Sequence, residues 1–213
     1  RYQFVYIPKT NVYRYFDNLE INDQSNMVYF NAYGYDWFNL NADEIKCVGH
    51  YEITIKLPPV PRNGVYELRY SVLAQPSRGI VQIYFGTDPD KLAVAGIPID
   101  LTVNTYGTTS SPKIGWIADT GDEETDNKND KAMHNRGYMK GPDSQCFTTA
   151  RTLARSQQNL LRKIVATQYL TPDVPHYIRF RSVTQNSLEF MLDYIELCPK
   201  SVYDNPIQRE DRH

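Results

Sequence analysis

The strongest constraint on the fold is the alternation of apolar and polar side chains over residues 64–86, GVYELRYSVLAQPSRGIVQIYFG. Up to residue 72 the ring and aliphatic side chains occupy every second position, which is typical of a strand with one buried face. The polar turn at residues 75–79 contains the Pro and Gly that stop and reverse a strand. Residues 80–85 are apolar on both faces except at Gln82, which indicates an interior strand. We therefore expect a β-hairpin around which the other strands assemble. The residues expected to face inward are Tyr66, Leu68, Tyr70 and Val72, and those expected to face outward are Glu67, Arg69 and Ser71.

Strand signals of the same kind recur along the chain. The clearest spans residues 51–57, where Tyr51, Ile53, Ile55 and Leu57 are expected to face inward. The other predicted strands are residues 1–7, 27–32, 94–103, 159–170, 176–183 and 188–197, the last with a bulge near Asp193. One short helix is expected at 148–158, a loop at 11–26 and a long irregular region at 104–147. About nine or ten strands with one helix predict an all-β, antiparallel β-sandwich with a long loop insertion.

The chain divides into three expected segments. An N-terminal strand and loop (1–26) could be the end of an upstream domain, the sandwich covers 27–203, and a polar tail covers 204–213. Because the sequence begins within a strand pattern, we expect further residues upstream. No apolar run approaches the roughly 20 residues of a membrane helix, so membrane association would need an anchor outside this chain.

Charge and cysteine content exclude several classes of protein. The formal net charge of −2 does not show the excess of basic residues that is typical of nucleic-acid-binding proteins. Cys47, Cys146 and Cys198 form no CxxC pair, which argues against zinc-finger and redox motifs. Their disulfide state stays open, with one pair plus a free thiol as an alternative.

Aromatic side chains gather with hydrogen-bonding groups in two segments. Sugar recognition uses flat rings against the apolar side of the sugar, while Asn, Asp and Arg bond its hydroxyls. Such side chains predict a carbohydrate or peptide ligand held by loops. The same rings could instead fold inward, or act as hot spots for a protein partner. The candidate ligand-binding residues are Asn31, Tyr33, Tyr35, Asp36 and Trp37 in the first segment, and Trp116, His134, Asn135, Arg136 and Tyr138 in the second.

The acidic run at residues 119–130 raises the question of calcium, which takes several oxygen ligands. Its spacing does not match an EF-hand loop, so we expect a solvated loop and no cofactor, with calcium as the alternative. Catalysis finds no support either. The chain has no Gly-x-Ser-x-Gly elbow, its four histidines are far apart, and nothing singles out a pair of carboxylates. We therefore expect a non-catalytic protein.

Five segments appear in an order and spacing found in one known fold. They are residues 51–57, 64–70, 79–85, 176–180 and 191–197. From Tyr51 onward the chain resembles a galactose-binding-like jelly roll, as in the carbohydrate-binding modules appended to glycoside hydrolases. The resemblance implies a structural calcium site in some members, and Asp193 lies at a comparable position in the last strand.

A narrower resemblance covers nearly the whole chain. It rests on residues 30–36 (FNAYGYD), 131–143 (KAMHNRGYMKGPD), 192–203 (LDYIELCPKSVY) and the ending 210–213 (EDRH). These look like the C-terminal region of fasciclin-domain lipoproteins of gut Bacteroidetes, although no fasciclin domain is evident in this sequence. The resemblance implies a lipid-anchored protein at the outer-membrane surface, with SusC/SusD-type nutrient importer components as partners. It implies a non-catalytic accessory role, either binding glycan or docking on the importer without binding sugar.

Overall fold

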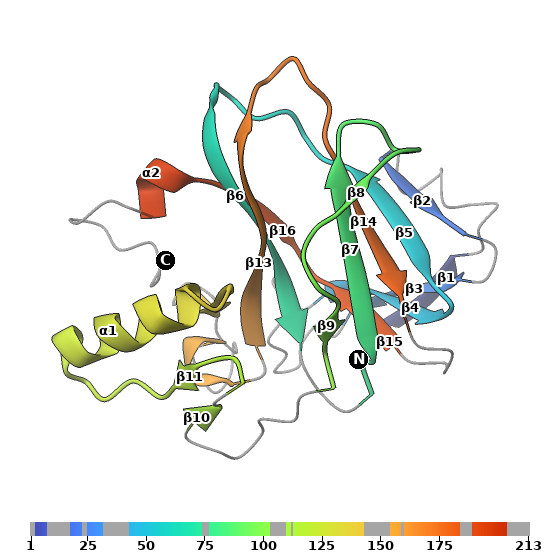
Figure 1. Cartoon of the computed structure of the whole chain (residues 1–213). Helices are drawn as coiled ribbons and strands as arrows, with labels where there is room; N and C mark the ends of the chain where they lie inside the picture. The colour runs from blue at the N-terminus through green and yellow to red at the C-terminus, as the bar shows by residue number, and fades with distance from the viewer. Residues whose placement is uncertain are drawn as a thin grey trace.

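The computed structural model describes residues 3–7, 18–22, 25–31, 43–73, 77–102, 110–111, 113–142, 154–158, 160–183 and 189–203. Its strands pair antiparallel and form layered sheets with one longer helix at the side (Figure 1). The all-β, antiparallel sandwich predicted from the alternation is therefore confirmed.

Two sheets form the layers of the sandwich. One has the strand order β12-β13-β6-β16, and the other has the order β2-β5-β14-β7-β8 with β9 also paired to β7. The first layer consists of β6 (Gly64–Leu73), β12 (Tyr138–Lys140), β13 (Leu160–Leu170) and β16 (Ile195–Pro199). The second consists of β2 (Leu19–Ile21), β5 (Glu52–Lys56), β7 (Ile80–Gly86), β8 (Ala93–Val94), β9 (Ile99–Asp100) and β14 (Tyr177–Ser182).

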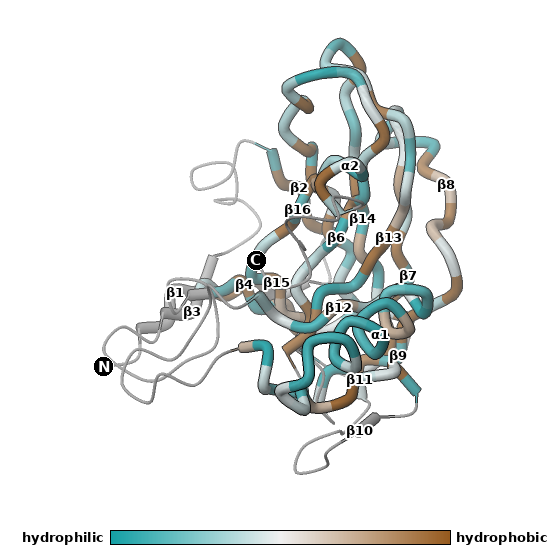
Figure 2. The backbone as a smooth tube through the Cα atoms, turned by 90° about the vertical axis from the view of Figure 1, so that its left-hand side faces the viewer, coloured by the Kyte–Doolittle hydropathy of each residue, from teal (hydrophilic) through white to brown (hydrophobic). Residues whose placement is uncertain are grey.

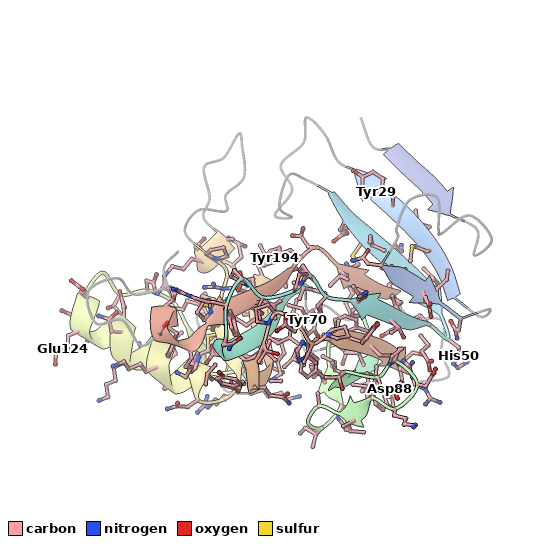
Figure 3. All side chains as sticks on the ribbon, turned by 90° about the horizontal axis from the view of Figure 1, so that it is seen from above. Tyr29, His50, Tyr70, Asp88, Glu124 and Tyr194 are labelled. Atoms are coloured by element: carbon pink, nitrogen blue, oxygen red, sulfur yellow. The ribbon has the colours of Figure 1, made fainter. Side chains whose placement is uncertain are left out.

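The hydrophobic core lies between these layers. The rings of Tyr70 on β6 and Phe180 on β14 meet edge to face with their centroids 5.1 Å apart. Tyr70 lies in the middle of the molecule when it is seen from above (Figure 3). Every residue predicted to face inward from the two clearest strands is buried. These are Tyr51, Ile53, Ile55, Leu57, Tyr66, Leu68, Tyr70 and Val72.

A third sheet adjoins the sandwich and shares its core. It has the strand order β1-β3-β4-β15. Phe190 of β15 is fully buried and stacks on Tyr51 with the ring centroids 5.1 Å apart. Its ring centroid lies 4.9 Å from that of Phe180. The strands of this sheet are β1 (Gln3–Ile7), β3 (Ser25–Asn31), β4 (Asp43–Gly49) and β15 (Glu189–Leu192), and a separate two-stranded pair joins β10 (Ser110–Ser111) to β11 (Trp116–Ile117).

The predicted hairpin is wrong in its pairing, although both of its strands exist. β6 lies between β13 and β16, whereas β7 lies between β14 and the short strands β8 and β9. The chain thus passes from one layer to the other between β6 and β7. Side-chain alternation reports which face of a strand is buried, but the partner strand is chosen by distant parts of the chain.

The single last strand predicted over 188–197 is also wrong, because it is two strands in different sheets. β15 pairs with β4 and β16 pairs with β6. The chain changes sheets at Asp193 and Tyr194, where the sequence predicts a bulge. A change of sheet and a bulge disturb the alternation in the same way, which explains the misinterpretation.

From Glu123 onward the acidic run is a helix and not a loop, although Asp122, Glu123 and Glu124 are solvent-exposed as expected. α1 (Glu123–His134) begins at Asp122, whose carboxylate accepts a hydrogen bond from the backbone N–H of Thr125 at 2.9 Å. Acidic side chains in the first turn and basic ones in the last complement the helix dipole. The tube of α1 is largely hydrophilic in Figure 2, and its buried residues are Asp126, Asp130 and Met133.

Several other boundaries differ from the prediction. The expected loop at 11–26 contains β2, whose Leu19 and Ile21 are buried. β4 is a strand that the sequence pattern does not predict, because its sequence contains several charged residues. The strand expected at 94–103 is reduced to β8 and β9, two residues each. Of the predicted helix at 148–158, Ala154–Ser156 is a 3₁₀ turn and 148–153 lie outside the described residues. The sequence pattern also does not predict the short helix α2 (Lys200–Tyr203). The helices in the described part of the chain are too short and too polar to cross a bilayer.

Candidate functional site

A cavity of about 450 Å³ lies where the edges of the two layers meet. This volume falls within the about 300–1,000 Å³ typical of small-molecule sites. β12 and β13 supply one wall, and the segment that contains β9 supplies the other. The apolar lining includes Ile83, Ile99 and Val165 from strands of the two layers and Ile114 from the segment before β11, while the exposed side chain of Ile97 lies at the rim. The polar lining consists of Asp100, Lys113, Arg136, Tyr138 and Lys163.

A tight turn at the end of α1 places Tyr138 in this cavity. Asn135 caps the helix, with its backbone N–H donating to the carbonyl of Lys131 at 3.0 Å. Gly137 then takes a φ of +78°, a left-handed conformation that glycine adopts without strain. β12 starts directly afterwards and pairs with β13, which sets Tyr138 opposite Lys163.

Lys163 and Tyr138 contact each other across the two strands. The Nζ of Lys163 lies 4.5 Å from the centroid of the Tyr138 ring and donates to the carbonyl of Gly137 at 3.0 Å. Burial lowers the pKa of Lys163 from its ordinary value. Burial also raises the pKa of Tyr138, and the negative charge of Asp100 raises it further. The phenol therefore stays protonated at neutral pH and can donate a hydrogen bond to a ligand.

Asp100 is held in place by the residues that follow it. Its Oδ1 accepts from the backbone N–H of Thr102 at 2.9 Å and from the hydroxyl of Thr102 at 2.6 Å. This local arrangement fixes an exposed carboxylate at the rim of the cavity.

The side chain of Arg136 packs against the backbone of Gly115 and lines the cavity. A Cβ added at Gly115 would lie 2.7 Å from the Nη1 of Arg136 and 3.0 Å from its Cδ. Gly115 also has a φ of +80°. Glycine at this position therefore serves both the turn and the placement of the guanidinium.

The structure separates the five residues predicted in the second segment. Arg136 and Tyr138 line the cavity, and Asn135 is exposed at the end of α1. Trp116 is only 3% exposed, with the Nζ of Lys140 5.8 Å from its ring centroid. His134 is packed against Tyr203, the ring centroids 3.9 Å apart. We therefore do not include Trp116 and His134 among the residues that we propose to contact a ligand.

The first predicted segment lies outside what the structure describes. Tyr33, Tyr35, Asp36 and Trp37 are not among the described residues, and only the backbone of Asn31, at the end of β3, is described.

Two residues predicted to face solvent belong to a buried ionic cluster. Glu67 and Arg69 are 1% and 0% exposed, because α2 and the His134 side chain at the end of α1 lie over the outer face of β6. Arg69 donates to Glu67 from Nη2 at 2.6 Å and from Nε at 3.1 Å, and Nε2 of His134 lies 3.1 Å from Glu67. Burial raises the pKa of Glu67, but the hydrogen bonds from His134 and Arg69 outweigh it and hold that pKa at about 2. The cluster fastens α1 and α2 to the first layer.

A second ionic cluster contains two carboxylates of the acidic run, those of Asp119 and Asp130. Asp119 accepts from Lys140 at 2.5 Å and from Nε of Arg155 at 2.6 Å, and Asp130 contacts both cations. Arg155 and Lys140 are 4% and 3% exposed. Hydrogen bonds from Arg155 and Lys140 lower the pKa of Asp119 against its burial. These carboxylates have protein cations as partners, which is the pairing that a buried charge requires.

Within the described ranges, no group of three or more His, Cys, Asp or Glu side chains is arranged to hold a metal ion. Asp193 lies between β15 and β16. Cys47 and Cys198 are in the thiol form, and burial raises the pKa of Cys47 to about 12. Cys146 is outside the described residues.

Local sequence signals find only part of the cavity. Arg136 and Tyr138 stand in a segment rich in rings and polar groups, which a search for ligand-binding loops detects. Lys163 reads only as a strand residue, because its place beside Tyr138 depends on the register between β12 and β13. Compared with protein-family models and with curated proteins, the sequence gives no match.

Proposed function

We propose that this chain is a non-catalytic binding module that holds a carbohydrate ligand in the cavity between the layers. The observation that carries the proposal is the combination, in one cavity, of an apolar interior with the Tyr138 phenol, the Asp100 carboxylate and the basic groups of Arg136 and Lys163. The cell-surface location, the lipid anchor outside this chain and an accessory role beside a SusC/SusD-type importer rest on the resemblance to fasciclin-domain lipoproteins.

The chemistry of the lining suits a saccharide. A sugar ring carries hydroxyls at its edge and C–H groups on its faces, so it needs apolar surface and hydrogen-bonding groups together. Ile97, Ile99 and Ile114 offer the apolar surface, while Tyr138 donates and Asp100 accepts hydrogen bonds.

The same lining argues against glycoside hydrolysis. Such catalysis commonly uses two carboxyl groups about 5–10 Å apart across the bond that is cut. Among the described residues of the cavity wall, Asp100 is the one carboxylate. The described lining of this site can hold a sugar but does not include the second carboxyl group that those mechanisms require.

The test is retention on a broad glycan array. Wild-type protein should be retained by at least one glycan, and Tyr138→Ala should lose that retention because it removes the phenol and part of the wall. Tyr169→Ala is the matched control, since Tyr169 is an exposed tyrosine of the neighbouring strand β13 and does not line the cavity. The control should be retained like the wild type.

Two results would reject the proposal: no retention of the wild-type protein on any glycan, or equal retention of wild type and Tyr138→Ala. Trp37→Ala examines the first predicted segment in the same assay. If that variant alone lost retention, the ligand would bind at residues 31–37 and not in the cavity.

A second candidate function is docking on a SusC/SusD-type importer without sugar binding. It is favoured by two apolar side chains that stand out from the second layer, Val94 at 60% and Ile97 at 86% exposure. Single exposed apolar residues are ordinary, but two so close in sequence are the kind of surface that a partner covers. Val94→Asp, which leaves the cavity lining unchanged, should then abolish co-purification with importer components from outer membranes, while retention on glycans would be absent from the start.

A further inference from the structure

We propose that the cavity selects an acidic saccharide, one whose sugar ring carries a carboxylate or a sulfate. The inference rests on the proposed function, because it names the ligand class of the same cavity. Its starting point is a charge imbalance: Lys113, Arg136 and Lys163 line the cavity against the single carboxylate of Asp100. The chain as a whole carries a formal net charge of −2, so the basic lining runs against the balance of the protein.

Lys163 carries most of the argument. Its contacts within the described residues are the carbonyl of Gly137 at 3.0 Å and the ring of Tyr138 at 4.5 Å. Neither contact is a carboxylate, although the side chain is partly buried and burial lowers the pKa of its amine. A buried charge normally has an opposite charge beside it. The acid group of a ligand would supply that charge here.

Arg136 and Lys113 extend the same polarity towards the mouth of the cavity. Both side chains are exposed, and the position of Arg136 is set by its close approach to Gly115. A guanidinium presents paired N–H groups that match the two oxygens of a carboxylate, and a lysine adds a point charge. Asp100 keeps its negative charge at the rim, so the lining carries three basic groups against one acidic group.

The apolar part of the lining decides what carries the acid group. Ile97, Ile99 and Ile114 would face the C–H surface of a sugar ring, whereas a small inorganic anion would leave them uncovered. At about 450 Å³ the cavity has room for more than an isolated anion. The two features together point to an anionic group attached to a hydroxylated ring.

The experiment is calorimetric titration of the whole chain with three matched oligosaccharides: an oligogalacturonate, a sulfated galacto-oligosaccharide and the neutral galacto-oligosaccharide. At least one acidic ligand should bind at least about tenfold more tightly than the neutral one, as expected for a charge-assisted hydrogen bond. The tighter of the two acidic ligands identifies the acid group. Raising the ionic strength from about 0.01 M to about 1 M should reduce this advantage, because the Debye length falls from about 30 Å to about 3 Å.

Variants place the effect in the cavity. Lys163→Met keeps the apolar stem and removes the charge, so it should lose the preference for the acidic ligand while neutral binding is unchanged. Lys56→Met is the matched control, an exposed lysine of β5 away from the cavity, and should behave like the wild type. If Lys163→Met does not fold, Lys113→Met gives the same comparison from the exposed mouth.

The outcomes separate this inference from the proposed function. Neutral and acidic ligands of equal affinity, both lost in Tyr138→Ala, would overturn the acidic ligand class and leave carbohydrate binding intact. No binding of any of the three ligands, together with no retention on the glycan array, would overturn both. Tighter acidic binding that Lys163→Met and Lys113→Met leave unchanged would also overturn the inference, because the charge would act elsewhere.

Discussion

Arg69 donates to Glu67, two residues before it on the same strand, with Nη2 and Oε2 2.6 Å apart and both side chains almost fully buried. Residues at i and i+2 share a face of a strand, so the pair lies on the side of β6 opposite the core. On that side His134 of α1, Lys200 of α2 and Glu196 of β16 complete the cluster. The outer face of the first layer therefore carries charged side chains that are shielded from water.

Glu67→Gln should destabilise the protein by about 3–5 kcal/mol at neutral pH, because it leaves buried Arg69 without its nearest anion. The measurement is urea denaturation across the acidic range. The folded pKa of Glu67 is about 2, below the ordinary glutamate value of about 4.3, so the stability that its charge supplies is complete above about pH 4.3 and is lost as the pH falls towards 2. The difference between wild type and variant should therefore shrink over that window.

Glu52→Gln is the control for that series. Glu52 of β5 is half-buried and lies 3.7 Å from Arg179 and 3.6 Å from Arg181. Pairs near the surface contribute about 0–1 kcal/mol, so this variant should stay close to wild type. Equal effects of the two substitutions would show that the Glu67 cluster does not stabilise the fold.

Gly115→Ala should weaken ligand binding without touching the ligand. A Cβ there would lie 2.7 Å from the Nη1 of Arg136, so the guanidinium has to move, and the φ of +80° adds about 1–3 kcal/mol of strain. Gly121→Ala is a matched control, with a φ of +87° and no atom within 4 Å of the added carbon. Both variants should lose stability on urea denaturation, but only Gly115→Ala should lose affinity in calorimetry. Equal affinities would mean that Arg136 does not contact the ligand.

Phe190→Ala should destabilise the protein by about 3–5 kcal/mol, since it opens a cavity where the ring packs against Tyr51 and Phe180. Phe190→Leu keeps most of the volume and should cost less than about 1.5 kcal/mol. Because Phe190 belongs to the third sheet but packs in the sandwich core, fluorescence and circular dichroism should report one transition. Two separate transitions in the wild type would show that the third sheet unfolds by itself.

Local patterns in the sequence predict which segments are strands and which faces are buried. Tyr66, Leu68, Tyr70 and Val72 are buried as expected, since the period of two is set by the backbone itself. The pattern does not say what covers the other face, so Glu67 and Arg69 read as solvent-facing until the helices are in place. The pattern also does not predict which strands pair: β6 pairs with β13, whose residues lie between 87 and 106 positions later in the chain, and not with the adjacent β7.

The helix α1 could have been found in the sequence. Asp122 followed by two glutamates, with Lys131 and His134 near the other end, is a typical pattern of a capped helix. The loop interpretation treats the acidic side chains as facing solvent and the calcium interpretation directs them to an ion, whereas Asp126 and Asp130 are buried against protein partners. The sequence prediction of the cavity suffers from the same error, because Arg136 and Tyr138 reach the cavity from the turn that follows α1.

The break at Asp193–Tyr194 gives one short run of backbone a place in two sheets. β15, which ends at Leu192, pairs with β4 through backbone hydrogen bonds, and β16, which begins at Ile195, pairs with β6 in the same way. Load applied to the third sheet would pass along this run directly into the middle of the first layer. The molecule should therefore resist peeling from that side as one mechanical unit, and a backbone cut at residue 193 or 194 would remove this link between the two sheets.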